Sequence, residues 1–188
     1  MKIGILGGSF NPPHRGHIIA AQEVLTFTDI EKVWLMPCFA HTFEKPLASV
    51  SDRLAMTQCL ESKNISVSSF EIDKKLDGET IHMVSALKKE YPGDEFVFLI
   101  GADKLASFTK WGEWERLLKE ISFVVIPRPE YPCLPLYPGM KVLDSPLFAS
   151  TGISSTMIRK RLAQGLSIAH LVPERVEGYI EKQKLYRF

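Results

Sequence analysis

The chain has 188 residues, of which 45% are hydrophobic and 24% charged, values typical of one globular domain. Lysine and arginine number 23 against 22 aspartates and glutamates, so the net charge of +1 argues against the basic surface of a nucleic-acid-binding protein. No apolar stretch approaches the roughly 20 residues that cross a bilayer, and the N-terminus lacks the features of a signal peptide. These properties predict a single cytoplasmic domain over residues 1–188, with neither nucleic acid nor membrane as a partner.

Apolar runs alternate with amphipathic segments along most of the chain. Five of the runs have the pattern of buried strands, at residues 2–6, 32–36, 65–70, 95–100 and 122–126, and a short sixth lies at 141–143. Between them, apolar residues at three- and four-residue spacing predict helices at 16–28, 52–62, 79–90 and 111–120. The alternation predicts an α/β fold with a doubly wound, mostly parallel sheet of five to six strands. Ligands of such sheets bind beyond the carboxyl ends of the strands.

The C-terminal part has a different pattern. A proline-rich stretch over residues 127–146 predicts an irregular loop, and helices are expected at 153–165, ended by a glycine, and at 173–184, begun by a proline. This helical part, about 153–188, could cover the sheet or pair with a second copy, so both a monomer and a homo-oligomer are open.

The three cysteines, Cys38, Cys59 and Cys133, are odd in number and widely spaced. None forms a pair at metal-binding spacing, so we expect reduced thiols in or near the core.

The stretch GGSFNPPHRGH, residues 7–17, follows the first strand. At Gly7 and Gly8 the missing Cβ permits positive φ and close approach of a ligand, and a helix N-terminus here would attract an anion. His14 and His17 are spaced to share one face of the first helical turn, with Gly16 leaving room between them for the ligand. Two surface histidines at a helix start remain the simpler alternative. The P-loop and GxGxxG patterns are absent, and no metal is predicted because a third ligand at metal spacing is missing nearby.

Two further segments carry polar side chains at expected strand or helix ends. Gly101 and Asp103 follow the fourth strand, where the carboxylate could hold a ribose or cap a helix. Ser154 and Ser155 open a later helix, and one of them suffices for capping. One turn on, Arg159 could bind a polyphosphate, or it could belong to a solvated basic face.

Read together, GSFNPPHRGH, GAD and ISSTMIR resemble the nicotinate-nucleotide adenylyltransferase family within the HxGH/ISSTxxR nucleotidyltransferase superfamily, whose fold is Rossmann-like. The resemblance extends over nearly the whole chain and includes DRLAM and KWGEWERLL. It implies that the phosphate of nicotinate mononucleotide attacks the α-phosphorus of Mg-ATP, giving a dinucleotide and pyrophosphate for NAD biosynthesis. No covalent enzyme intermediate is implied.

The resemblance also assigns roles to residues. His14 and His17 would contact the ATP phosphates, and His17 would stabilise the transition state. Asp103 would hold the ribose of ATP. Ser154 and Ser155 would hold the triphosphate, and Arg159 would hold its β- and γ-phosphates. The implied ATP-binding set is Gly7, Gly8, Ser9, Phe10, His14, His17, Gly101, Asp103, Ile153, Ser154, Ser155 and Arg159.

The acceptor side departs from the family pattern. Where the family has Pro-His-Lys after the second strand, this chain reads PCFAHTFEK over residues 37–45. Lys45 is the best candidate for the catalytic basic group that reaches the phosphates and the acceptor, with His41 behind it. Thr80 and Trp111 would complete the acceptor pocket. Other acceptors stay open, namely nicotinamide mononucleotide and phosphopantetheine, as does a cytidylyltransferase that uses CTP. A non-catalytic nucleotide-binding module is a further alternative.

Overall fold

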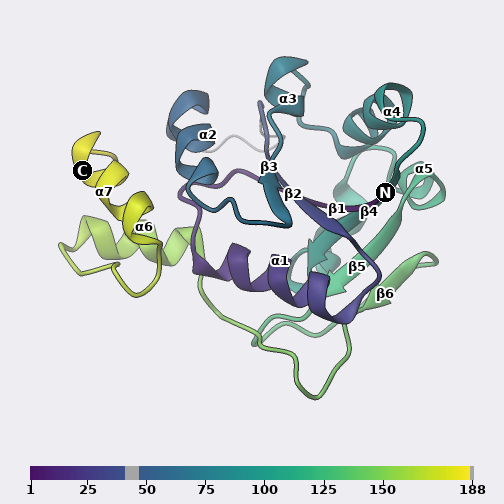
Figure 1. Cartoon of the computed structure of the whole chain (residues 1–188). Helices are drawn as coiled ribbons and strands as arrows, with labels where there is room; N and C mark the ends of the chain where they lie inside the picture. Colours follow the sequence, from purple (N-terminus) through teal and green to yellow (C-terminus); the bar gives the residue numbers. More distant parts are fainter. Residues whose placement is uncertain (41–46, 187–188) are drawn as a thin grey trace.

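The computed structural model describes residues 1–40 and 47–186. In this part of the chain, strands form one sheet in the order β3-β2-β1-β4-β5-β6, and each neighbouring pair is parallel (Figure 1). The strands are β1 (Lys2–Gly8), β2 (Lys32–Pro37), β3 (Ile65–Val67), β4 (Glu95–Gly101), β5 (Ser122–Ile126) and β6 (Met140–Val142). The predicted doubly wound α/β fold is confirmed.

The helices lie where the sequence predicts them, with two additions. They are α1 (Arg15–Phe27), α2 (Val50–Gln58), α3 (Phe70–Asp73), α4 (Thr80–Glu90), the 3-10 helix η1 (Ala102–Lys110), α5 (Trp114–Glu120), α6 (Ser155–Ala163) and α7 (Glu174–Lys182). The sequence pattern did not predict α3 and η1.

Three predicted boundaries are wrong for local reasons. The helix predicted to end at residue 62 ends at Gln58, because the N–H groups of Cys59 and Leu60 donate three residues back and form a turn. The third strand ends at Val67 instead of residue 70, because the Ser69 hydroxyl donates to Asp73 Oδ2 at 2.6 Å and a short helix begins there. The helix predicted from residue 111 begins at Trp114, since Glu113 has a left-handed φ of 47° and Trp111 ends η1.

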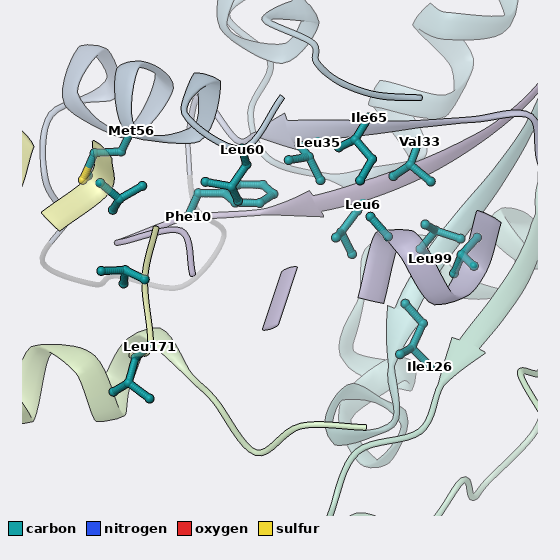
Figure 2. Packing of buried hydrophobic residues seen from close by; sticks show 14 of the residues in the cluster. Leu6, Phe10, Val33, Leu35, Met56, Leu60, Ile65, Leu99, Ile126 and Leu171 are labelled. Atoms are coloured by element: carbon teal, nitrogen blue, oxygen red, sulfur yellow. The ribbon is translucent and has the colours of Figure 1, made fainter. Parts of the chain in front are cut away.

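Buried side chains cover both faces of the sheet, which explains why the strands are apolar runs and not alternating patterns. On one face, Leu6, Leu35, Leu99 and Ile126 converge from neighbouring strands, with Phe10 close by (Figure 2). The opposite face carries a second cluster built around Ile3, Ile5, Phe98, Phe108 and Phe123.

The C-terminal helices pack on the chain's own core. Ile158 of α6, Leu171 of the connecting segment, and Val176 and Ile180 of α7 all belong to the first cluster. Figure 1 shows α6 and α7 beyond α2, on the side of the molecule away from β6. Of the two roles left open for this part of the chain, covering the core is the one observed.

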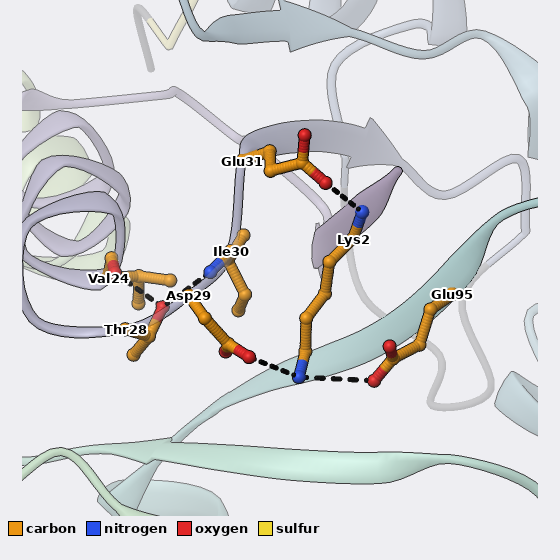
Figure 3. Close-up of polar contacts among 7 residues, drawn as sticks. All are labelled: Lys2, Val24, Thr28, Asp29, Ile30, Glu31 and Glu95. Carbon is orange, nitrogen blue, oxygen red and sulfur yellow. Dashed lines mark hydrogen bonds and ion pairs between the residues drawn. The ribbon is translucent and has the colours of Figure 1, made fainter.

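Polar contacts hold the amino ends of the strands, opposite the site described below. Lys2 Nζ contacts Asp29 Oδ2 at 2.9 Å and Glu95 Oε1 at 3.1 Å, and its backbone N–H donates to Glu31 Oε1 at 2.8 Å (Figure 3). These contacts join the starts of β1, β2 and β4. The carboxyl ends of the strands remain available for a ligand.

Two further predictions concern membranes and cysteines. Among the described residues, none of the helices is both long and apolar enough to span a bilayer. Cys38, Cys59 and Cys133 are free thiols and half-buried, as the sequence predicts.

Candidate active site

A cavity of about 860 Å³ lies at the carboxyl ends of β1, β4 and β5. The strand order reverses between β1 and β4, which is where doubly wound sheets bind ligands. Most predicted site residues line it: Gly7, Gly8, Ser9, Phe10, His14, His17, Thr80, Gly101, Asp103, Trp111, Ser154 and Ser155. Ile153 and Arg159 are not among the residues that line it. Lys45 and His41 fall outside the described residues.

The conformation of the first loop corrects one expectation. Gly7 and Gly8 continue β1 without positive φ, and the left-handed residue is Phe10, with a φ of 46°. The Phe10 side chain is 1% exposed and packs against the His17 ring at a centroid distance of 4.7 Å. Phe10 therefore anchors the loop in the core and supports His17, in addition to lining the cavity.

Asn11 holds this loop to two distant parts of the chain. Its side-chain oxygen accepts hydrogen bonds from the Ala48 N–H at 3.0 Å and from the Tyr186 hydroxyl at 2.7 Å. No local pattern predicts this role, because the partners lie 37 and 175 residues away along the chain. The loop is thus fixed by the segment before α2 and by the C-terminus.

The start of α6 fastens to the same loop. Ser154 caps the helix by accepting from the Met157 N–H at 3.2 Å, and the Ser155 hydroxyl donates to the Pro12 carbonyl at 2.8 Å. Arg159 Nη1 donates to the Asn11 carbonyl at 2.6 Å. The guanidinium predicted to bind only phosphates therefore also holds the loop, a partner that sequence spacing could not reveal.

The two histidines meet as predicted. Their rings lie 3.8 Å apart between centroids, and the His14 backbone N–H donates to His17 Nδ1 at 3.1 Å. Because Nδ1 of His17 accepts this bond, the ring proton of the neutral form resides on Nε2. Burial, with the nearby charge of Arg128, lowers the pKa of His17 to about 4. His17 therefore presents an uncharged N–H donor to the cavity at neutral pH.

Gly16 lines the cavity, as expected, and it also makes room for His14. A Cβ on Gly16 would lie 2.9 Å from His14 Nδ1, so only glycine lets this ring fold against the start of α1. The His14 side chain is buried, and burial lowers its pKa well below the usual value. Both histidines are thus neutral, and the alternative of two surface histidines is wrong for His14.

Asp103 folds back over the end of β4. A Cβ on Gly101 would collide with Asp103 Oδ1, so the glycine permits this position. Lys104 Nζ lies 3.1 Å from Oδ2, and Arg128 Nε lies 3.5 Å from Oδ1. Asp103 belongs to η1, whose N-cap is Gly101, so the helix-cap interpretation of this carboxylate is wrong. A carboxylate fixed at a cavity wall suits a ribose diol.

The far half of the cavity combines an aromatic side chain with a helix start. Trp111 lies edge-on to Phe98 at 5.9 Å and also lines the cavity, so it both packs and is available to a ligand. Thr80 begins α4. Beside them, Glu79 Oε2 accepts from the Gly112 N–H at 3.1 Å. This half is suited to an aromatic ring with a polar substituent.

Glu71 is a buried carboxyl group that the sequence reasoning missed. It lines the cavity and is 7% exposed, and within the described residues its Oε2 has no hydrogen-bond partner. Burial raises the pKa of Glu71 to about 7, against the opposing effects of the Phe39 backbone and Arg53. A single glutamate in the four-residue helix α3 carries no sequence signal for such burial.

The raised pKa of Glu71 makes its ionisation costly to the fold. From a usual value of 4.5, a folded pKa of about 7 corresponds to a penalty of about 3 kcal/mol above pH 7. Glu71→Gln should therefore raise the free energy of unfolding at pH 8 by up to that amount. The gain should vanish below pH 4.5, where the folded and unfolded carboxyl groups are both protonated.

Urea unfolding at pH 4 and pH 8 measures this difference. The exposed Glu115→Gln serves as the matched control and should change little at either pH. Equal stability of wild type and Glu71→Gln at pH 8 would show that Glu71 ionises without cost.

Comparison with known proteins decides the family. Residues 5–161 match the family described as Cytidylyltransferase-like. The chain is 37% identical over 191 residues to a protein of Anaeromyxobacter dehalogenans named "Probable nicotinate-nucleotide adenylyltransferase", covering 99% of this chain and 97% of that one. A protein of the same name from Exiguobacterium sibiricum is 37% identical over 190 residues and is covered to 99%. The chain belongs to the nicotinate-nucleotide adenylyltransferase family.

A solved structure of similar fold agrees with the family. The nicotinic acid mononucleotide adenylyltransferase of Plasmodium falciparum, complexed with NaAD, superposes with a TM-score of 0.83, covering 98% of this chain and 97% of that one. Sequence identity is 23%, so this likeness concerns the fold. The resemblance read from the HxGH, GAD and ISSTMIR motifs is confirmed at the level of the family.

Proposed function

We propose that this member of the nicotinate-nucleotide adenylyltransferase family transfers the adenylyl group of ATP to nicotinate mononucleotide, forming the dinucleotide and pyrophosphate for NAD biosynthesis. One observation carries the proposal. A single cavity at the β1/β4 switch point brings together the histidine loop, the Asp103 carboxylate and the start of α6. These are the parts that the adenylyl donor requires.

The proposed pose of ATP follows from these parts. Asp103 holds the ribose hydroxyls, and Ser154, Ser155 and the N-terminal end of α6 receive the triphosphate. The α-phosphorus then lies beside His17. Arg159, one turn into α6, contacts the outer phosphates when its bond to the Asn11 carbonyl is released or shared.

In the reaction, an oxygen of the acceptor phosphate forms a bond to the α-phosphorus, and the bond from that phosphorus to the oxygen bridging to the β-phosphate breaks. Pyrophosphate leaves with the electron pair. Nε2–H of His17 donates to an oxygen of the α-phosphate as negative charge grows there. Catalysis consists of positioning and charge stabilisation, with the protein forming no covalent bond.

The acceptor occupies the half of the cavity lined by Thr80 and Trp111, where the indole packs against the pyridine ring. Lys45, outside the described residues, is proposed to bridge the acceptor and ATP phosphates, with His41 behind it. Glu79 gives a reason to test a second acceptor. Its carboxylate beside Trp111 would repel nicotinate and would accept an N–H from nicotinamide.

Mg²⁺ is proposed to enter with ATP. Within the described residues, no group of three or more histidine, cysteine, aspartate or glutamate side chains gathers as a metal site. This composition fits an ion held mainly by phosphate oxygens and water, as Mg²⁺ commonly is beside nucleotides. When bound, it would neutralise part of the triphosphate charge.

A pyrophosphate-release panel tests the proposed function. ATP or CTP is paired with nicotinate mononucleotide, nicotinamide mononucleotide or phosphopantetheine, with Mg²⁺ present. We expect release with ATP and nicotinate mononucleotide to exceed every other pair. Faster release with CTP, nicotinamide mononucleotide or phosphopantetheine would overturn the assignment of substrates, and no release with any pair would favour a non-catalytic nucleotide-binding module.

A further inference from the structure

Arg128 is a cavity-lining cation to which the motifs assign no role. It follows β5 directly, between Pro127 and Pro129, which restrict the backbone on both sides. Its Nη2 donates to the Ile153 carbonyl at 3.1 Å, immediately before the Ser154 cap of α6. Its Nε lies 3.5 Å from Asp103 Oδ1. One side chain thus connects the ends of β4 and β5 with the start of α6.

We propose that Arg128 is a positioning residue for ATP: it holds the ribose-binding carboxylate and the triphosphate-binding helix end at a fixed spacing, and its charge acts on the histidine pair. The inference rests on the proposed function for the identity of the nucleotide. The bridge and the charge are properties of the protein alone, so they can be measured without turnover.

The bridge is not fully closed in the free protein. The buried Arg128 Nε has no hydrogen-bond partner within the described residues, and 3.5 Å to Asp103 is longer than the 2.7–3.2 Å of an N–H···O bond. A donor left unpaired at a cavity wall costs stability unless a ligand uses it. We expect this N–H to shorten its contact with Asp103 when the carboxylate receives a ribose.

The charge of Arg128 reaches the catalytic loop. It lowers the pKa of both His14 and His17, in addition to the larger effect of burial. The other charged side chains that line the cavity are Glu71, Glu79, Asp103, Lys104 and Lys110. Arg128 thereby adds to the effect of burial, which keeps His17 uncharged with its Nε2 as the donor that the triphosphate meets.

Substitutions separate the two effects. Arg128→Lys keeps the charge but lacks the planar fork that reaches two oxygens at once. Arg128→Met removes both the charge and the planar fork, and it retains much of the apolar part of the side chain. Arg116→Met is the matched control, because Arg116 is exposed, pairs with Glu113 and is not among the residues that line the cavity.

The readouts are ATP affinity by calorimetry and the titration of His17 by NMR. We expect Arg128→Met to weaken ATP binding at least tenfold and to raise the pKa of His17. Arg128→Lys should weaken binding comparably while leaving the His17 titration near that of wild type. Arg116→Met should change ATP affinity less than threefold. Circular dichroism checks that each variant is folded.

Two results would overturn the inference. One is wild-type ATP affinity and wild-type His17 titration in folded Arg128→Met. The other is wild-type ATP affinity in Arg128→Lys, which would show that ATP binding does not depend on the bridge between Asp103 and α6. If wild-type protein failed to bind ATP, the proposed function itself would fail, and the His17 titration would still test the charge effect of Arg128 independently.

Discussion

Replacing His17 with alanine is expected to lower kcat by about 10²- to 10³-fold, the scale for losing one donor that stabilises a transition state. The physical reason is the fixed tautomer: Nδ1 accepts the His14 backbone N–H, so Nε2 carries the proton that faces the reacting phosphate. Since the pKa of His17 is about 4, this donor is present throughout the neutral pH range. ATP affinity should change less than kcat.

Steady-state pyrophosphate release measures this loss. His170→Ala is the matched control, because His170 is exposed and is not among the residues that line the cavity, and its turnover should equal that of wild type. A folded His17→Ala protein with near-normal kcat would remove His17 from the chemistry.

Replacing Arg53 with methionine is expected to destabilise the protein by about 3–5 kcal/mol. The Arg53 side chain is 1% exposed and donates to the carbonyls of Ala48, Ser9 and Cys38 at 3.3, 3.0 and 2.8 Å. Methionine fills a similar volume but leaves these buried oxygens without their donor. The loop after β1 and the segment after β2 would lose their common attachment.

Urea unfolding followed by circular dichroism measures this change. Arg116→Met is the control, since Arg116 is exposed and makes one i,i+3 ion pair with Glu113, and it should change stability by less than about 0.5 kcal/mol. An Arg53→Met protein within 1 kcal/mol of wild type would show that water or other donors replace the guanidinium.

The sequence predicted the sheet well because its central strands, β1 and β4, are buried on both faces. Phe96 to Ile100 in β4 is a continuous apolar run, and such runs in alternation with helices allow few topologies. Since carboxyl ends of parallel strands share one edge, the motif after β1 and Asp103 after β4 were expected to meet, and they do.

The parts that could not be predicted depend on contacts between distant residues. Arg128 connects with Asp103 and Ile153, and Arg53 with Ser9, through pairings that no local pattern encodes. The left-handed backbone conformation lies at Phe10 and not at Gly7, because the core accepts the aromatic ring of Phe10. Where the core has room for such a ring is a property of the assembled fold. The family resemblance predicted that His14 and His17 belong to the site, but it did not explain why both side chains are uncharged.

The central claim is that the adenylyl group moves from ATP to nicotinate mononucleotide in this cavity, and the most direct test follows the α-phosphate. Wild-type protein is incubated with ATP labelled at the α-phosphorus, Mg²⁺ and nicotinate mononucleotide, and the products are separated by chromatography. The account predicts that the label appears in the nicotinate adenine dinucleotide at the same rate as pyrophosphate is released. With His17→Ala, this rate should be at least 10²-fold lower. Label remaining in ATP, or passing to any product other than that dinucleotide, would contradict it.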